Sequence, residues 1–375
     1  MADRARFAIV AGARPNFMKV APLMRELDGH AAGEVIFVHT GQHYDPLLSD
    51  VFLEDLQLRR PDFHLEVGSG THGQQTARVM ERFEEVLLRL AEQGRAISRV
   101  VVVGDVNSTL GAALAAAKLC IPVAHVEAGL RSFDRTMPEE LNRVLTDAIS
   151  DMLFVSEPAG VANLRREGKP AEQIHLVGNV MIDTLRQLLP RAQKRPILDK
   201  LGLQPREYGV VTLHRPSNVD DPKILSRLLE VLVETSKCLP MVFPVHPRTR
   251  SRIEKFELTA NLNGKPGAQL IALEPLGYLD FLALTSQARM IITDSGGLQE
   301  ESTALGIPCL TVRWNTERPI TMEQGTSTLV GNDAEKLREK IFEVLENRYK
   351  SGVCPELWDG KAAQRIANIL LEEYI

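Results

Sequence analysis

The chain has 375 residues, of which 44% are hydrophobic and 25% are charged, so it is long enough for about two domains that each bury a substantial core. Its formal net charge of -5 and its pI near 6.0 exclude a general nucleic-acid binder, because such proteins usually carry a basic excess. The four cysteines lie far apart without the paired spacing of a metal site, so we expect a reducing, cytoplasmic setting and no bound metal.

The sequence contains no targeting or membrane-spanning pattern. Residues 1–6 lead directly into a short apolar run without a secretory signal, and the Ala-rich stretch 110–117 is followed by Lys118 and Pro122. We therefore expect no membrane insertion. The glycine patterns of nicotinamide-binding and P-loop nucleotide-binding proteins are also missing, so we expect no cofactor.

Short apolar strands alternate with amphipathic stretches along the first half of the chain, which predicts βαβ units around a parallel sheet. The strands of this first series are predicted at residues 7–10, 35–38, 100–103 and 122–126. A second series follows, with strands at 209–213, 241–244, 270–273, 290–293 and 308–312, and with helices at 223–236, 278–285 and 298–305. Two such series indicate two doubly wound α/β domains.

The alternating pattern loosens between residues 176 and 205, which predicts the domain boundary there. We therefore expect an N-terminal Rossmann-like domain at 1–180 and a second one at 181–360, with a C-terminal helix at 361–375 that could pack back on the first domain. Ligands of such sheets bind outside the carboxyl ends of the strands, so the active site is expected in the cleft between the domains.

Polar clusters follow the predicted strands of the first domain. Arg14 and Lys19 lie in a strand-to-helix turn and could meet a phosphate, or the turn could be a solvated loop. Asp105 follows a fully apolar strand, and its alternative role is that of a helix cap. Glu127 ends the next strand and suits acid–base chemistry, unless it only forms an ion pair with Arg131.

Another acidic pair, Glu139 and Glu140, opens a helix, where solvated glutamates are common. The second domain supplies more cations after its strands. His214 and Arg215 follow one strand, His246 follows the next, and Arg313 lies farther along. Acids from the first half and anion-binding groups from the second half together indicate a nucleotide diphosphate held by one domain, with acids and bases presented by the other.

The segment from Thr293 to Glu301 has the pattern of a phosphate-binding helix start. Gly296 and Gly297 would let the backbone approach an anion, and the free N–H groups of the first helical turn favour negative charge. A carboxylate one turn later could bind ribose hydroxyls. The alternative is an ordinary Asp or Ser cap with glycines that allow tight packing.

These motifs, taken in order from Gly12 to Pro319, resemble the non-hydrolysing UDP-N-acetylglucosamine 2-epimerases. The matching runs include GARPNFMK, GDVNST, HVEAGLR, PEELNR, DSGGLQEE and TERP. The resemblance implies a GT-B-like fold of two Rossmann-like domains and reversible inversion at C2 of UDP-GlcNAc to give UDP-ManNAc. It also implies a homodimer and a supply of ManNAc-type sugars for cell-surface polysaccharides.

The mechanism implied by the resemblance is anti elimination of UDP through a 2-acetamidoglucal, followed by re-addition. It implies Asp105, Glu127 and Glu139 as acid–base groups, with His214, Arg14 and Lys19 assisting. The remaining implied substrate-binding residues are Arg215, Ser295, Gly296, Gly297 and Arg313, with Glu301 at the ribose.

Relatives with an activating second UDP-GlcNAc site suggest allosteric residues here, although the motifs match only in part. The residues concerned are Gln42, His43, Gln75 and His246. The run from Arg131 to Glu140 also resembles relatives that epimerise a UDP-2,3-diacetamido uronic acid, which is the alternative substrate. Two further interpretations stay open at this point, a GT-B glycosyltransferase and a catalytically silent sugar-nucleotide sensor.

Overall fold

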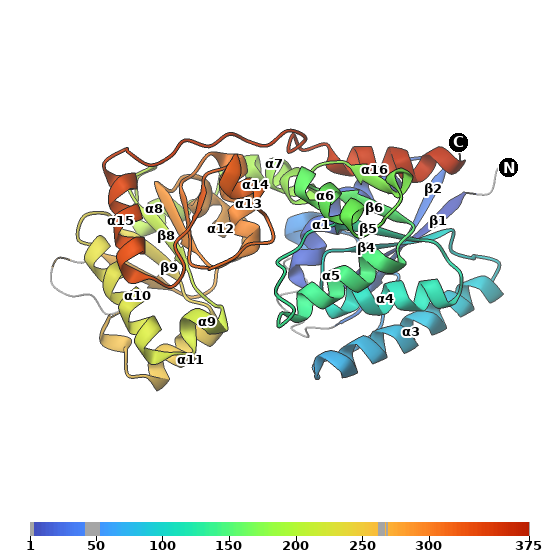
Figure 1. Ribbon diagram of the computed structural model, residues 1–375, viewed down its shortest axis with the longest axis horizontal. Helices are drawn as coiled ribbons and strands as arrows, with labels where there is room; N and C mark the ends of the chain where they lie inside the picture. Colours follow the sequence, from blue (N-terminus) through green and yellow to red (C-terminus); the bar gives the residue numbers. More distant parts are fainter. Residues whose placement is uncertain (1–3, 42–52, 262–266, 268, 375) are drawn as a thin grey trace. The chain divides into compact units, whose positions relative to one another are not determined.

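The computed structural model describes residues 4–41, 53–261, 267 and 269–374, and it divides the chain into two compact units (Figure 1). Unit 1 comprises residues 1–187 and 356–375, and unit 2 comprises residues 188–355. The first boundary therefore lies within helix α7 (Val180–Ala192), near the predicted position at 180. The C-terminal helix belongs to unit 1.

Unit 1 is built on a parallel sheet of seven strands in the order β3-β2-β1-β4-β5-β6-β7. Its strands are β1 (Ala5–Ala11), β2 (Gly33–His39), β3 (Phe63–His64), β4 (Arg99–Val103), β5 (Val123–Ala128), β6 (Met152–Val155) and β7 (Ile174–Leu176). The helices of unit 1, besides most of α7, are α1 (Arg14–Asp28), α3 (His72–Glu92), α4 (Asn107–Lys118), α5 (Pro138–Ile149), α6 (Pro158–Arg166) and α16 (Ala362–Leu371), with short 3₁₀ turns at Ala171–Gln173 and Glu372–Tyr374.

Helices cover both faces of this sheet, which is why its central strands are mostly apolar. Every residue of β4 is buried. On one face α3, α4 and α5 lie side by side, and on the other α1 packs with α16 (Figure 1). Helix α3 begins with a capping box between Thr71 and Gln74, and it turns Val79, Phe83 and Leu87 toward the core.

Unit 2 contains a second parallel sheet, of six strands in the order β10-β9-β8-β11-β12-β13. Its strands are β8 (Gly209–Thr212), β9 (Met241–Pro244), β10 (Leu270–Leu273), β11 (Met290–Thr293), β12 (Cys309–Thr311) and β13 (Ser327–Leu329). Its helices are α8 (Ile197–Leu201), α9 (Pro216–Val219), α10 (Pro222–Thr235), α11 (Pro247–Lys255), α12 (Tyr278–Ser286), α13 (Gly296–Leu305), α14 (Ile320–Glu323) and α15 (Ala334–Leu345), with a 3₁₀ turn at Thr259–Asn261.

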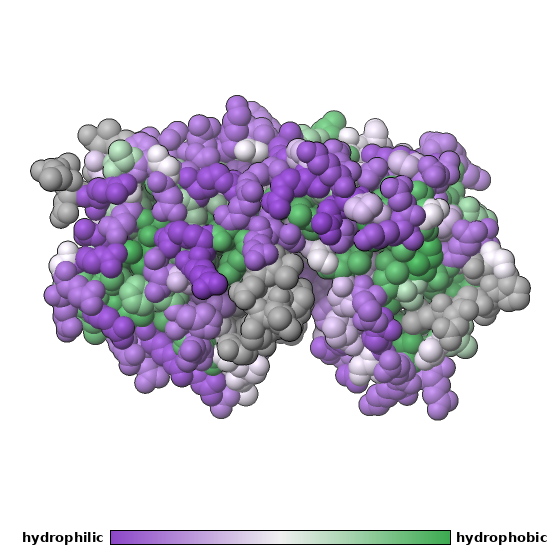
Figure 2. Space-filling model, turned by 180° about the vertical axis from the view of Figure 1, so that it is seen from behind, coloured by the Kyte–Doolittle hydropathy of each residue, from purple (hydrophilic) through white to green (hydrophobic). Residues whose placement is uncertain are grey.

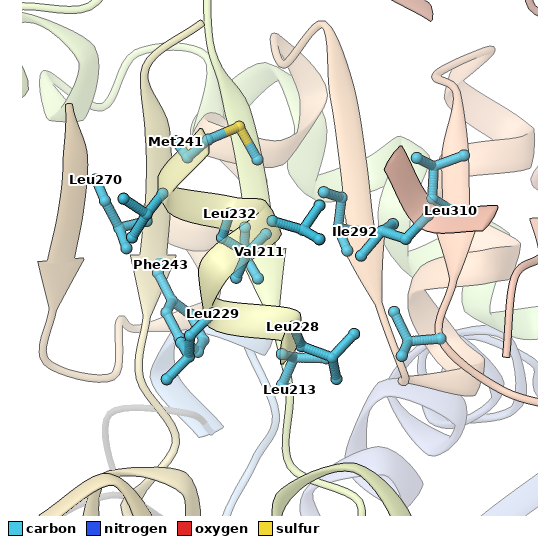
Figure 3. Packing of buried hydrophobic residues seen from close by; sticks show 14 of the residues in the cluster. Val211, Leu213, Leu228, Leu229, Leu232, Met241, Phe243, Leu270, Ile292 and Leu310 are labelled. Atoms are coloured by element: carbon cyan, nitrogen blue, oxygen red, sulfur yellow. The ribbon is translucent and has the colours of Figure 1, made fainter. Parts of the chain in front are cut away.

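The core of unit 2 forms where helix α10 packs on one face of the sheet. Figure 3 shows Leu228, Leu229 and Leu232 of α10 next to side chains of the strands, among them Val211 and Phe243. In β8 and β9 the core side chains come from alternate positions, as the pleat of a strand requires. Outside such cores, the face drawn in Figure 2 is largely hydrophilic, with small hydrophobic areas between polar residues.

All of the strands predicted from the sequence are present, each within about two residues of its predicted bounds. The short strands β3, β6, β7 and β13 were not predicted. None of the helices in the described part of the chain is both long and apolar enough to cross a membrane.

Strand order reverses direction at one place in each sheet, between β1 and β4 in unit 1 and between β8 and β11 in unit 2. In open parallel sheets, the loops that leave the carboxyl ends of the strands diverge at such a point and leave room for a ligand. Predicted site residues follow each of these strands, with Lys19 after β1, Asp105 after β4, His214 after β8 and Ser295 after β11.

Candidate active site

The turn after β1 is tied to the end of β4 by one asparagine. The Oδ1 atom of Asn16 accepts a hydrogen bond from the Ala13 N–H (3.1 Å), and its Nδ2 donates to the Val103 carbonyl (2.9 Å). A side chain at Gly12 would place its Cβ 2.0 Å from Ser108 Oγ, so only glycine fits there. The turn is therefore held close to the start of α4.

Lys19 and Glu127 form a buried ion pair at this edge of the sheet. Glu127 has a φ of 71°, and the register between β5 and β6 shifts between Val126 and Ala128. A non-glycine residue rarely adopts this conformation, and such irregularities often redirect a side chain next to a functional site. The strand thus presents Glu127 to the cation from α1.

Asp105 is held by Arg143 of helix α5. Its Oδ2 atom accepts from Arg143 Nε (3.0 Å) and Nη2 (2.9 Å), and its side chain is 24% exposed. The structure does not support a capping role, because α4 begins after Val106 without a side-chain cap. Asp105 is therefore an oriented carboxylate that solvent can reach.

Of the acidic pair that opens α5, Glu139 is half-buried in the first turn, whereas Glu140 is buried. Glu140 accepts hydrogen bonds from the Ser132 N–H and hydroxyl and from the Phe133 N–H, and it pairs with Arg143. Glu140 was not among the predicted site residues. Its contacts fix the loop that leads into α5 and the arginine that holds Asp105.

A second buried charge cluster lies at the end of β5. His125 contacts Asp147, whose other oxygen accepts from Arg131 Nη2 (2.7 Å), and Arg131 also pairs with Glu167 (2.6 Å). Burial raises the pKa of Asp147, but His125 and Arg131 lower it more, so that the net shift is downward. The ion pair between Glu127 and Arg131 considered above was therefore wrong: each has other charged partners, Lys19 for Glu127 and two acids for Arg131.

Gln75, predicted as an allosteric residue, joins the same edge of unit 1. Its Oε1 accepts from Asn107 Nδ2 (2.8 Å), and its Nε2 donates to the Gly68 carbonyl (3.3 Å). Asn142 donates to Asn107 and to the Asp105 carbonyl (2.9 Å). Gln75 is thus connected to Asp105 through two amides.

In unit 2, Asp294 organises the residues that follow β8. It is fully buried and accepts hydrogen bonds from the N–H groups of His214 and Arg215 and from Asn218 Nδ2. The Nδ1 atom of His214 lies 2.7 Å from Asp294 Oδ1, and Arg215 Nε donates to the Asp294 carbonyl. Burial raises the pKa of Asp294, but the His214 ring and the backbone N–H groups of His214 and Arg215 together lower it more, so the net shift is downward.

Helix α13 begins at Gly296 and uses Ser295 as its N-cap residue, but the Ser295 side chain makes no capping hydrogen bond. The N–H groups of the first turn are therefore not satisfied by that side chain. A Cβ at Gly296 would lie 2.8 Å from Arg318 Nη1 and 3.0 Å from Glu317 Oε1. The glycine brings the helix start next to a charged cluster, an arrangement suited to an anion.

Glu301 lies in this helix, fully buried, and accepts a hydrogen bond from the Tyr278 hydroxyl (3.0 Å). Burial raises the pKa of Glu301 to about 7. The next group, Arg313, donates to Glu317 (2.7 Å), and Arg318 bridges Glu317 and Glu300. The buried Nη1 of Arg313 makes no hydrogen bond with any described residue.

His246 caps helix α11, because its Nδ1 accepts from the Arg248 N–H (3.2 Å). Its ring lies 5.5 Å from that of His214, and burial lowers the pKa of His246. Both rings line a pocket of about 160 Å³ together with Thr212, Leu213, Pro244, Pro275, Leu276 and Phe281. A predicted catalytic residue and a predicted allosteric residue thus share one pocket of unit 2.

For three of the predicted residues, the structure describes no side chain. Gln42 and His43 lie outside the described residues, and so does the side chain of Arg14, although its backbone begins α1. Among the residues that the structure does describe, no group of three or more His, Cys, Asp or Glu side chains is arranged to hold a metal ion.

The chain is similar to known proteins along nearly its whole length. A family model described as UDP-N-acetylglucosamine 2-epimerase matches residues 25–371. A UDP-N-acetylglucosamine 2-epimerase of Methanococcus maripaludis is 41% identical, over 98% of this chain and 99% of its own. A UDP-2,3-diacetamido-2,3-dideoxy-D-glucuronate 2-epimerase of Pseudomonas aeruginosa is 38% identical, over 96% of this chain and 98% of its own.

A solved structure leads to the same group of proteins. The crystal structure of Methanocaldococcus jannaschii UDP-GlcNAc 2-epimerase in complex with UDP-GlcNAc and UDP matches with a TM-score of 0.85 at 41% identity. The match covers 97% of this chain and 99% of that one. The two parallel-sheet units are therefore those of a GT-B-like fold, as the sequence predicted.

Proposed function

Because the chain belongs to the UDP-N-acetylglucosamine 2-epimerase family and is an isomerase, we propose that it interconverts UDP-GlcNAc and UDP-ManNAc by inverting C2. The observation that carries this proposal is the group of acidic side chains at the carboxyl edge of the unit 1 sheet. Asp105 is oriented by Arg143, Glu127 is paired with Lys19, and Glu139 stands in the first turn of α5.

The chemistry requires such a group. The C2 hydrogen of UDP-GlcNAc is not next to a carbonyl, so its removal is coupled to departure of UDP from C1. Anti elimination gives 2-acetamidoglucal and UDP, and re-addition with a proton delivered to the opposite face of C2 gives the epimer. Both directions need a base on one face and an acid on the other, which Asp105, Glu127 and Glu139 would provide.

Unit 2 offers groups suited to the UDP that departs. The Ser295 N–H already donates to Thr293 Oγ1 (2.9 Å), so the Ser295 hydroxyl and the N–H groups of Gly296 and Gly297 would bind the diphosphate. The nearby cations Arg215 and Arg313 would assist, and the unsatisfied Nη1 of Arg313 supports this assignment. His214, whose Nδ1 faces Asp294, would direct Nε2 toward the phosphates. Glu301 is proposed to accept hydrogen bonds from the ribose, as it does from the Tyr278 hydroxyl.

A second substrate is supported by one comparison. The Pseudomonas aeruginosa relative at 38% identity is named for a UDP-2,3-diacetamido-2,3-dideoxy-D-glucuronate. The reaction at C2 would be the same, because the carboxylate of that sugar is at C5 and does not take part in the elimination.

The decisive experiment is incubation of the pure protein with UDP-GlcNAc in deuterated water, followed by proton NMR. We expect deuterium at C2 and a mixture of UDP-GlcNAc and UDP-ManNAc. If UDP-GlcNAc stays unchanged and the UDP-2,3-diacetamido uronic acid is turned over, the uronic acid is the substrate instead of UDP-GlcNAc. Free ManNAc with UDP would contradict a non-hydrolysing reaction.

We further propose that the enzyme acts as a homodimer and supplies ManNAc-type sugars for cell-surface polysaccharides. Light scattering coupled to size exclusion tests the first point. A mass near the 41.6 kDa of one chain would contradict it.

A further inference from the structure

The imidazole of His125 is fully buried and contacts a polar atom on each side. Its Nε2 lies 2.8 Å from the Gly104 carbonyl oxygen, and its Nδ1 lies 2.6 Å from Asp147 Oδ1. His125 belongs to β5, Gly104 follows β4, and Asp147 belongs to α5. One side chain therefore connects three elements of unit 1.

The partners determine where the ring protons lie. A carbonyl oxygen can only accept, so Nε2 must donate to Gly104. Asp147 already accepts from the Gly129 N–H (3.0 Å) and from Arg131, which favours its carboxylate form. Its remaining oxygen therefore accepts from Nδ1, and His125 is a donor on both sides.

Each of the three connected elements carries a predicted acid–base residue. Gly104 directly precedes Asp105, His125 lies two positions before Glu127 in the same strand, and Glu139 lies in the first turn of α5. Helix α5 also supplies Arg143, which holds Asp105. The His125–Asp147 pair therefore links the three elements that carry these residues.

The Gly104 turn tolerates little movement. Gly104 has a φ of +67°, and a Cβ there would lie 2.8 Å from Lys19 Nζ and 3.8 Å from Glu127 Oε2. A rotation of this peptide would therefore displace Asp105 and disturb the ion pair between Lys19 and Glu127. The hydrogen bond from His125 to the Gly104 carbonyl opposes such a rotation.

We propose that His125, oriented by Asp147, is a positioning residue for the acid–base groups of unit 1. It does not touch the substrate, and it acts by fixing the Gly104 peptide and with it Asp105. This inference rests on the proposed epimerase function. Misplacement of a reacting group by about 1 Å can reduce a rate by about 100-fold, so the effect belongs in kcat.

The test compares three variants in the deuterium-exchange assay. Asp147→Ala removes the acceptor of Nδ1 and leaves the ring free to turn, so kcat should fall about 100-fold with KM within about twofold. Asp147→Asn keeps an oxygen that can accept from Nδ1 but turns its NH2 group toward the Gly129 N–H and Arg131, so it should restore part of the loss. Glu167→Gln is the matched control, because it removes the outer partner of Arg131 without touching Asp147, and it should match the wild type.

A merely structural role would lower the melting temperature of Asp147→Ala and leave the kcat of its folded protein unchanged, and that result would overturn the inference. If Asp147→Ala does not fold, NMR of wild-type protein with ¹⁵N-labelled histidines decides. We expect one histidine with two slowly exchanging ring N–H protons, and absence of the Nε2 proton would overturn the inference. Wild-type protein without C2 exchange on either UDP-sugar would instead refute the proposed function.

Discussion

Replacing Asp105 should separate proton transfer at C2 from the binding of UDP. Asp105 is oriented by Arg143 but remains partly exposed, so Asp105→Asn should keep the fold while losing proton transfer. We expect C2 exchange to fall by about 10²–10⁴-fold, the usual contribution of a general acid or base. UDP affinity, measured by calorimetry, should stay within about twofold, because the proposed diphosphate groups lie in unit 2.

Asp134→Asn provides the control for Asp105→Asn. Asp134 lies in the loop between β5 and α5, and its carboxylate accepts hydrogen bonds from the hydroxyl and the N–H of Thr136, within the same loop. Its replacement should leave C2 exchange unchanged. Equal losses in both variants would mean that general electrostatics near α5, rather than Asp105, sustain the reaction.

Gly296 marks the point where unit 2 would meet a diphosphate. In Gly296→Ala the new Cβ would lie 2.8 Å from Arg318 Nη1, so the arginine or the helix start must shift. Overpacking of this kind costs about 1–3 kcal/mol, and we expect UDP binding to weaken by about tenfold or more. Gly277→Ala is the control, because a Cβ there meets no described atom within 4 Å. Unchanged UDP affinity in Gly296→Ala would argue against this anion site.

Residues of the site differ in how far the sequence could predict them. Asp105 follows β4, Glu127 lies near the end of β5 and His214 follows β8, and that position in a parallel sheet predicts that each lies at the carboxyl edge of its own sheet. Glu140 and Asp147 lie inside helix α5, where an acid usually faces solvent, so only the packed structure shows them buried against Arg143 and His125. Their burial depends on which face of α5 meets its neighbours, and one sequence does not fix that.

At the scale of elements, the C-terminal helix is capped by an acid from α7. Both oxygens of Asp183 accept from α16, one from the Ala362 N–H (3.1 Å) and one from the Ala363 N–H (2.7 Å). Burial raises the pKa of Asp183 from 3.8 to about 6. Because the folded pKa is raised, the stabilising contribution of the protonated form is complete below about pH 4 and is lost as pH rises through about 6.

Asp183→Asn should remove this dependence. The amide keeps one oxygen for the helix N–H groups and carries no charge, so at pH 8 the variant should be more stable than the wild type, by on the order of 2 kcal/mol. Urea unfolding at pH 5 and pH 8 measures the difference. In both proteins the free energy of unfolding should still fall toward neutral pH because of Glu301, whose pKa is raised to about 7. Identical pH slopes in the two proteins would contradict the assignment.

Three of the four strands that the sequence missed, β3, β7 and β13, lie at sheet edges and share a physical cause. β3 has two residues, and β7 and β13 have three each, with partly exposed side chains and no regular apolar alternation. Such short edge segments become strands because a neighbour offers hydrogen bonds, which is a property of the sheet. β4 and β11, in contrast, are fully buried and apolar at all but one position, and their pattern alone predicts them.

At the scale of the whole molecule, unit 1 is built from two separate chain segments, whereas unit 2 is built from one. The unit 1 core includes Trp358, whose Nε1 donates to the Ser156 carbonyl, and the buried Ile366 and Leu370 of α16. Tyr374 packs edge-on against Phe7, with ring centroids 5.9 Å apart. Removal of residues 356–375 would therefore expose apolar surface on α1 and the sheet.

We expect the fragment 188–355 to unfold cooperatively on its own, and the fragment 1–187 to bind a hydrophobic dye and to lack a cooperative transition. Supplying residues 356–375 as a peptide should restore that transition. Circular dichroism during heating measures all three samples. A cooperative transition of 1–187 alone at the temperature of the intact protein would contradict this view of unit 1.

The return of the last segment to unit 1 also sets the order of events on the ribosome. The first 187 residues leave the exit tunnel early, but the helix that completes their core is translated only after all of unit 2. At about 5–20 residues per second, the delay is roughly 10–40 s. During that time the α1 side of the nascent sheet is uncovered, whereas unit 2 can close as soon as it emerges. We therefore expect nascent chains of this protein to expose apolar surface at their N-terminal half while unit 2 folds first.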